Sequence, residues 1–257
     1  MFIFRILKRC RFVSIPGLSE WLETPQGRYL LEWEQKRLEA VVADIFGYNA
    51  MQLGLPGLDL LSANRMPFRF RCASRGDVAV VASYEDLPFA SGSLDLVVLP
   101  HVLEFSSRPH QVLREVERVL VAEGSVVISG FNPYSLWGVR RLAARKGGVM
   151  PWTGQYLSVP RIRDWFSLLG FETQAGGFGC YVPAVTTPEW LDRWRFMDRF
   201  GPRWWPVCGA AYVVQGIKRV QGTRLIMPNW NERRASSKRL SAVAQREIHP
   251  GSTRKTQ

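Results

Sequence analysis

The feature that most constrains the fold is a strand, helix, strand pattern between Leu94 and Ile128. The run Leu94–Leu99 is apolar apart from Asp95, which is typical of a strand buried on both faces of a parallel sheet. Apolar residues then recur with a helical period, and Val126–Ile128 predicts a second buried strand. The helical residues, which follow Pro109 and precede Gly124, are Val112, Leu113, Val116, Val119 and Leu120. The pattern predicts an open α/β fold in which the unit crosses over right-handed.

The residues of this unit also resemble a known family. Leu87-Pro88-Phe89 precedes Ser93-Leu94-Asp95-Leu96-Val97-Val98, and Arg118-Val119-Leu120 leads into the turn at Glu123-Gly124. These segments are similar to the second half of a class I methyltransferase domain of the type 11 group, which uses S-adenosylmethionine and includes quinone- and biotin-pathway enzymes. The resemblance is dense over residues 87–133 and weaker from 46 to 218. It implies a Rossmann-like methyltransferase fold, with a seven-stranded, mostly parallel sheet and helices on both faces.

The chain divides into three predicted parts. Residues 1–46 form an N-terminal helical extension, in which Thr24-Pro25 begins a helix that runs to about Phe46. Its charged side is expected to include Glu34. Residues 47–220 form the methyltransferase-like domain, and 221–257 a disordered basic tail.

The net charge of +12 is concentrated at the C-terminal end. From Lys218 onward, ten lysines and arginines face two glutamates. Such a tail could hold RNA or an acidic membrane through salt-sensitive contacts, and a solubilising extension without a partner explains it equally well.

Composition narrows the class of protein. The four cysteines show no Cys-x-x-Cys spacing and there are only three histidines, which argues against a metal centre or a disulfide framework. Free thiols are typical of a reducing compartment, so we expect a cytoplasmic location. The start of the chain has no small-residue cleavage site, and no apolar run is long enough to span a bilayer.

The glycine-rich turn departs from the family's pattern. The family has an acid before this turn, where this chain has Gln52, and Pro56 replaces an expected glycine. No clear counterpart of the ribose-binding acid occurs in Phe68–Cys72. The resemblance then implies that the contacts to S-adenosylmethionine come from Gln52, Gly54, Gly57, Ser83, Glu85, Asp86, Leu87 and Pro100.

These departures leave two hypotheses. In the first, the protein is an S-adenosylmethionine-dependent methyltransferase with a divergent cofactor pocket, acting on an unidentified and most simply small-molecule acceptor by in-line displacement. In the second, it is a catalytically inactive methyltransferase-like module that serves as a binding or scaffold protein, for example on RNA. Oligomeric state is open in both.

His101 and Glu104 are the candidate catalytic residues. They follow the strand Leu94–Leu99, at the crevice where the chain order of an open sheet reverses and ligands bind. Either side chain could act as a general base if the methyl acceptor carries a proton. A histidine that only caps a helix is the alternative.

Seven tryptophans lie between Trp137 and Trp205, interleaved with arginines. A helical spacing predicts a buried stripe formed by Trp190, Leu191, Trp194, Met197 and Phe200, while stacking on bases or contact with a membrane interface is the alternative. The loop 143–156 is long and aromatic enough to act as a lid. Asn132-Pro133-Tyr134 is interpreted as a turn that borders the substrate.

Overall fold

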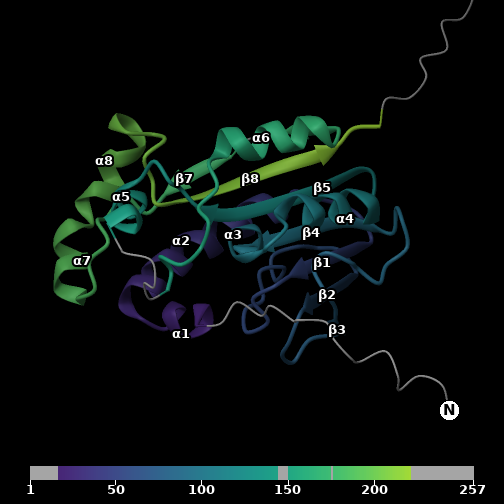
Figure 1. The fold of residues 1–257 in the computed structure, drawn as a ribbon, viewed down its shortest axis with the longest axis horizontal. Coiled ribbons are helices and arrows are strands. Elements are labelled where there is room, and N and C mark those ends of the chain that lie inside the picture. Colours follow the sequence, from purple (N-terminus) through teal and green to yellow (C-terminus); the bar gives the residue numbers. More distant parts are fainter. Residues whose placement is uncertain (1–16, 144–149, 175, 221–257) are drawn as a thin grey trace, which may run out of the picture. The chain divides into compact units, whose positions relative to one another are not determined.

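An eight-stranded sheet forms the centre of the protein (Figure 1). The computed structural model describes residues 17–143, 150–174 and 176–220. The strands lie in the order β3-β2-β1-β4-β5-β8-β6, and β7 pairs with β8. Neighbours from β3 to β5 are parallel, whereas β8 is antiparallel to its three partners. The strands are β1 (Asn49–Leu53), β2 (Phe68–Ala73), β3 (Val80–Val81), β4 (Leu94–Pro100), β5 (Leu120–Phe131), β6 (Phe171–Thr173), β7 (Gly177–Gly179) and β8 (Ala211–Lys218).

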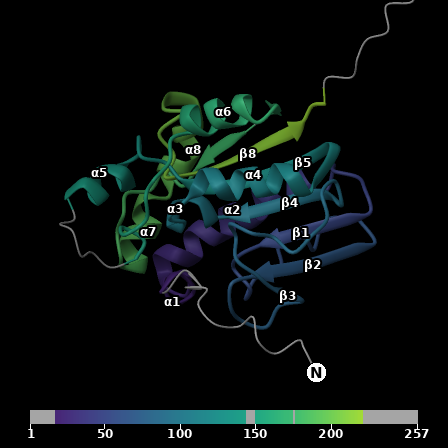
Figure 2. The ribbon, with the colours of Figure 1, turned by 45° about the vertical axis from the view of Figure 1, so that its right-hand side comes forward.

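Helices cover both faces of the sheet (Figure 2). Val97 and Leu99 of β4 share a core with the apolar residues of α4, whereas Leu96 and Val98 share another with Leu38 of α2. Because alternate strand residues point to opposite faces, α2 and α4 lie on opposite sides. The helices are α1 (Leu18–Leu22), α2 (Pro25–Val42), α3 (Val102–Phe105), α4 (Pro109–Val119), α5 (Leu136–Ala143), α6 (Val159–Leu168), α7 (Pro188–Trp194) and α8 (Phe196–Trp204). The predicted fold class is confirmed, with the short β7 as an additional strand.

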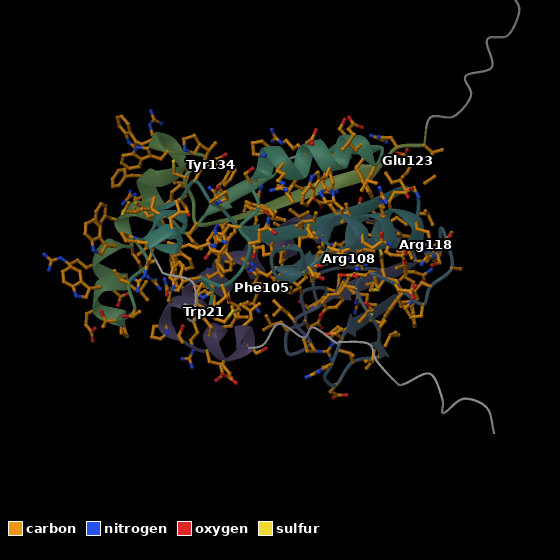
Figure 3. The ribbon with its side chains drawn as sticks, viewed as in Figure 1. Trp21, Phe105, Arg108, Arg118, Glu123 and Tyr134 are labelled. Carbon is orange, nitrogen blue, oxygen red and sulfur yellow. The ribbon has the colours of Figure 1, made fainter. Side chains whose placement is uncertain are left out.

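The predicted strand, helix, strand unit corresponds to β4, α4 and β5. Arg118, at the end of α4, donates to the carbonyls of Leu87 (2.9 Å) and Phe89 (2.8 Å), while Glu115 accepts from the Leu87 amide. Figure 3 labels Arg118 on this side of the molecule and Trp21 of α1 on the opposite side. The ion pair of Arg118 and Glu115 thus fixes the Leu-Pro-Phe segment against α4.

The connections between β1, β2 and β3 contain no helix. Residues 54–67 and 74–79 run as turns, all of them within the described residues. The Asn64 side chain braces the first connection: its Nδ2 donates to the carbonyls of Val42 (2.6 Å) and Ile45 (3.0 Å), and its Oδ1 accepts from the Met66 amide. Side-chain amides here satisfy backbone groups that a helix would satisfy by itself.

Helix α2 begins as predicted but ends earlier, at Val42. The Thr24 hydroxyl caps it by accepting from the Gly27 amide. Its buried residues follow a four-residue spacing, which places one side of the helix against the sheet. They include Glu34, so the prediction that Glu34 lies on the charged, exposed side is wrong.

The predicted buried stripe of α7 and α8 is correct at Leu191, which is buried, and wrong at Trp190 and Phe200, which are each 49% exposed. Trp194 and Met197 are half-buried. The inner side of α8 is formed instead by small and polar residues: Gly201 lies against the ring of Tyr181, and Asp198 accepts from the Tyr29 hydroxyl. The periodicity is real, but the aromatic side faces outward.

Two other predicted features lie around the end of β5. Trp137 is fully buried, and its Nε1 donates to the carbonyl of Val182. Asn132 is buried and donates to the carbonyls of Val207 and Gly209, while Tyr134 is exposed. Residues 144–149 of the proposed lid loop, the start of the chain and the basic tail lie outside the described residues. Among the helices described, none has both the length and the apolar character needed to cross a membrane.

Candidate functional site

The turn after β1 lies at the carboxyl end of the sheet. Gly54 adopts a φ of 92° and Leu55 a φ of 45°, both in the left-handed region. A Cβ at Gly54 would lie 2.8 Å from a methyl carbon of Val102, so this glycine is required by the backbone and by packing. The turn and the start of α3 are therefore in contact at the point where β1 and β4 end.

The side chain of Gln52 fixes the conformation of this turn through hydrogen bonds to its backbone. Its Nε2 lies 3.0–3.1 Å from the carbonyls of Gly54, Leu55 and Leu58, and its Oε1 accepts from the Leu60 amide. The side chain is buried, and its amide is used entirely on the backbone. Gln52 can therefore act on a ligand only through the shape of the turn.

Two cavities border the turn. One, of about 210 Å³, is lined by Ala73 of β2, by Ser74 and its neighbours in the following turn, and by Tyr84, which comes after β3. The other, of about 170 Å³, is lined by Gly57 and by residues of α1 and α2. Ser19 and Leu55 line both cavities, so these two side chains lie between them. Each cavity alone is below the range of about 300–1,000 Å³ that is usual for ligand pockets.

Ser74 is a polar residue of this site that the sequence analysis missed. It directly follows β2, two residues beyond the segment in which the acid was sought. Its Oγ is buried and has no hydrogen-bond partner in the described part of the chain. The Tyr84 side chain lies beside it, without the geometry of a hydrogen bond. A buried, unpaired hydroxyl in a cavity wall is suited to bind a polar ligand group.

Gly57 is the predicted cofactor residue that lines a cavity. A Cβ built at Gly57 would contact no atom within 4 Å. The position is therefore open toward the cavity, and a larger side chain could enter it without moving the backbone.

The other predicted cofactor residues have local partners. Ser83 and Asp86 close a tight turn, and the Ser83 hydroxyl accepts from the Glu85 amide. Glu85 itself accepts from the Ser107 hydroxyl. Leu87 is buried beneath α4, and Pro100 ends β4. The structure thus brings Gly54 and Pro100 together, while the turn at residues 83–86 reaches this region through Tyr84.

His101 lies at the end of β4 between two glutamates. Its Nδ1 is 2.9 Å from Oε2 of Glu104, and its Nε2 is 2.9 Å from Oε1 of Glu34 on α2. The second carboxylate oxygen of Glu104 accepts from the Phe131 amide. All three side chains are buried, so the two predicted catalytic residues are brought together but are not exposed to solvent.

The charges of this network are strongly coupled. Burial disfavours the charged imidazole, but Glu34 and Glu104 outweigh that effect and raise the pKa of His101 to about 10. Burial also raises the pKa of Glu104, although His101 and the Phe131 amide act in the opposite direction. The network therefore retains a proton at neutral pH, and an imidazolium is a poor general base.

Aromatic rings surround the network. The ring centroid of Phe131 lies 4.4 Å from that of His101 and 5.0 Å from that of Tyr156. Tyr156 is buried, and burial is the largest cause that raises its pKa. These rings and α2 separate His101 from solvent.

A larger cavity, of about 440 Å³, lies on the other side of α2. Tyr29 and Trp33 of α2 face residues of β7 and α8 across it, including Phe178 and Arg199. Asp198 accepts a hydrogen bond from the Tyr29 hydroxyl, at 2.6 Å. Within the described residues, no group of three or more His, Cys, Asp or Glu side chains is arranged to hold a metal ion.

Comparisons with known proteins agree with this architecture. Residues 55–128 match the methyltransferase domain family of the type 11 group. The chain is 32% identical over 154 residues to the uncharacterized protein YafS of Escherichia coli, covering 59% of this chain and 64% of that protein. It is also 32% identical over 103 residues to malonyl-[acyl-carrier protein] O-methyltransferase of Laribacter hongkongensis, covering 40% and 34% of the two chains. The chain therefore spans less than two thirds of each of these relatives.

Solved structures show the same fold. A protein solved in complex with the Trm112 methyltransferase activator of Haloferax volcanii superposes with a TM-score of 0.57 at 16% identity, over 82% of this chain and 99% of that one. A methyltransferase of Archaeoglobus fulgidus that depends on S-adenosylmethionine superposes with a TM-score of 0.53 at 15% identity, over 73% and 94%. The chain therefore has the class I methyltransferase fold, and its residues 55–128 are similar to the type 11 methyltransferase domain.

Proposed function

We propose that this protein binds S-adenosylmethionine at the two cavities around the β1 turn and transfers its methyl group to a small-molecule acceptor. The observation that carries the proposal is the position of these cavities. They lie at the carboxyl ends of β1 and β2, and their walls combine residues of the segment that matches the methyltransferase family with residues of α1 and α2. Ligands of open α/β sheets bind at this edge.

The residues present fit such a cofactor in two respects. The unpaired Ser74 hydroxyl would bond a ribose hydroxyl in place of the usual carboxylate, and Gly57 leaves space for a ligand close to the backbone. Movement of Ser19 and Leu55 would join the two cavities into one of the usual size. When bound, S-adenosylmethionine supplies a methyl group on a sulfonium sulfur, which an acceptor displaces in line.

In this proposal the chain's own residues chiefly bind and orient. Gln52 fixes the turn that carries Leu55 and Gly57, so that the backbone is arranged before a ligand arrives. His101 and Glu104 hold the end of β4 against α2. Their assignment as general bases stays a prediction, and their burial favours a positioning role.

The test is calorimetry of the purified chain with S-adenosylmethionine and with its demethylated product. We expect a micromolar dissociation constant, about 8 kcal/mol of binding free energy. Gly57→Val should weaken binding about 10-fold or more with little change in melting temperature, because the new methyl groups enter the cavity. Ala90→Val, in an exposed turn at the other end of β4, is the matched control and should bind normally.

The second candidate function is a binding or scaffold module without catalysis. It is favoured by the polar groups at the ends of β1 and β4, which have partners within the protein: Gln52 bonds the turn, and His101 is hydrogen-bonded to Glu104 and ion-paired with Glu34. Absence of heat and of a thermal shift at millimolar S-adenosylmethionine would favour this function over the first.

A further inference from the structure

Helix α8 turns an apolar stripe away from the protein. Phe196, Phe200 and Trp204 recur every four residues and share one side of the helix, and their surfaces are 53%, 49% and 69% exposed. The opposite side packs inward, where a Cβ on Gly201 would lie 2.3 Å from the ring of Tyr181. Among the described residues, Phe196 contacts the ring of Trp194, with the two ring centroids 5.7 Å apart, and about half or more of each side chain of the stripe stays exposed.

The charges on α8 are divided in the same way. Asp198 is the one carboxylate in the sequence of α8, and it accepts from the Tyr29 hydroxyl and from the Tyr181 amide. It is therefore directed inward. Arg199 and Arg203 are both exposed, and Arg199 also lines the cavity between α8 and α2. The exposed surface of α8 thus combines aromatic rings with cations and presents no outward carboxylate of its own.

Neighbouring segments extend this surface. Trp205 and Val207 follow α8 and are more than half exposed. In α7, Trp190 is half exposed, and the guanidinium of Arg193 lies 5.3 Å from its ring centroid. We call residues 188–207 the α7–α8 surface. Its four arginines, Arg193, Arg195, Arg199 and Arg203, outnumber the exposed carboxylates Glu189 and Asp192 of α7.

Helix α5 repeats the pattern. Leu136, Val139 and Leu142 recur every three residues and are exposed, next to the exposed Arg140. Figures 1 and 2 both place α5 with α7 and α8 at the end of the sheet where β5 finishes. Separate helices therefore expose apolar stripes with arginines at one end of the molecule.

We propose that the α7–α8 surface docks on an anionic lipid bilayer. Tryptophan and phenylalanine gain free energy at the boundary of headgroups and acyl chains, and arginine can keep its charge at the anionic headgroups while its stem contacts lipid. The stripe lies on the outer surface of a helix and not in a groove. A bilayer can accept such a surface, because it needs no pocket of matching shape. The distribution over three helices favours a broad, flat partner over a single groove in another protein.

The experiment is sedimentation of the full chain with vesicles of phosphatidylcholine alone, or of equal parts phosphatidylcholine and phosphatidylglycerol. We expect binding to the mixed vesicles. Phe200→Ser/Trp204→Ser should lower the partition coefficient about 10-fold or more, because two aromatic side chains no longer enter the lipid. Phe46→Ser is the matched control: it removes a side chain that is 75% exposed just before β1, and binding should not change.

A second variant tests the electrostatic part. Arg199→Gln/Arg203→Gln should weaken binding to the mixed vesicles about 10-fold and reduce its dependence on salt. Circular dichroism and melting curves would confirm that each variant is folded.

Three results would overturn the proposal. One is absence of binding to the mixed vesicles, and another is equal binding by both variants and the unchanged chain. The third is loss of RNA binding or of self-association in the Phe200→Ser/Trp204→Ser variant without any vesicle binding, which would assign the surface to nucleic acid or to a second copy of the chain.

Discussion

The two halves of the parallel sheet are built in different ways. Between β4 and β5 the connection is a regular helix whose apolar residues pack on the sheet. Between β1, β2 and β3 the connections contain no helix, and in the first of them the buried amides of Gln52 and Asn64 bond the backbone instead. One half therefore depends on many interchangeable apolar contacts, and the other on a few specific polar ones. The half that departs from the family's sequence pattern is also the one held by polar side chains.

The largest effect is expected where the two halves meet, at His101. Its replacement by alanine leaves Glu34 and Glu104 buried and facing each other without the intervening cation. Breaking a buried ion pair by removing one partner typically costs about 3–5 kcal/mol. Urea unfolding should show a loss of this size in His101→Ala. His110→Ala, which replaces an exposed histidine, is the control, and a similar loss in both variants would contradict a special role for the network.

The next effect tests the polar half directly. Gln52→Leu should lower the free energy of unfolding by about 3 kcal/mol, because three carbonyls and one amide lose their partner in a buried turn. Gln215→Leu is the matched change in β8, where the side chain makes one long hydrogen bond of 3.5 Å to Ser125. It should cost less than about 1 kcal/mol. Equal losses would mean that the two regions do not differ in this respect.

The smallest effect is a dependence of stability on pH. The folded state raises the pKa of His101 from 6.5 to about 10, so its stabilisation is complete below about pH 6.5 and is lost as the pH rises through about 10. We expect a decrease of about 2 kcal/mol, less than an isolated group would give, because the glutamates share the proton. Urea unfolding at several pH values would measure it.

Two variants of α2 test whether His101 is the source of this pH dependence. Glu34→Gln should flatten the dependence, because Glu34 is the largest influence that raises the pKa of His101. Glu39→Gln, which removes an exposed carboxylate from the same helix, should leave the slope as it is. An unchanged slope in Glu34→Gln would exclude His101 as its source.

The regular half was predictable from the sequence. The segments β4, α4 and β5 are long and strongly periodic, so hydrophobic pattern, proline and glycine together indicate their type and place. The connections 54–67 and 74–79 were not predictable in the same way. The course of 54–67 depends on hydrogen bonds from Gln52 and Asn64 to backbone groups up to 22 residues away, and no local pattern reports such bonds.

The sequence did contain a signal that Glu34 is buried. Glu34 lies on the four-residue spacing that joins Leu30, Leu38 and Val42, which is the buried side of α2. Its charge nevertheless suggested an exposed position, because the partner that satisfies it, His101, comes from a strand far along the chain. The aromatic stripe of α8 failed for the opposite reason. A helical period tells which residues share a side, and it does not tell which side faces the core.

Helix α2 borders three parts of the molecule: the smaller cavity near α1, the His101 network and the large cavity beneath α8. Its 18 residues form a rod about 27 Å long. Leu31 borders the smaller cavity near α1, Glu34 meets His101, and Trp33 lines the large cavity beneath α8. Because the helix is rigid, a movement of α2 at one of these three places also moves it at the other two. Any ligand that displaces α2 from one side therefore changes the affinity for a ligand on the other side, and thermodynamic linkage makes that effect reciprocal.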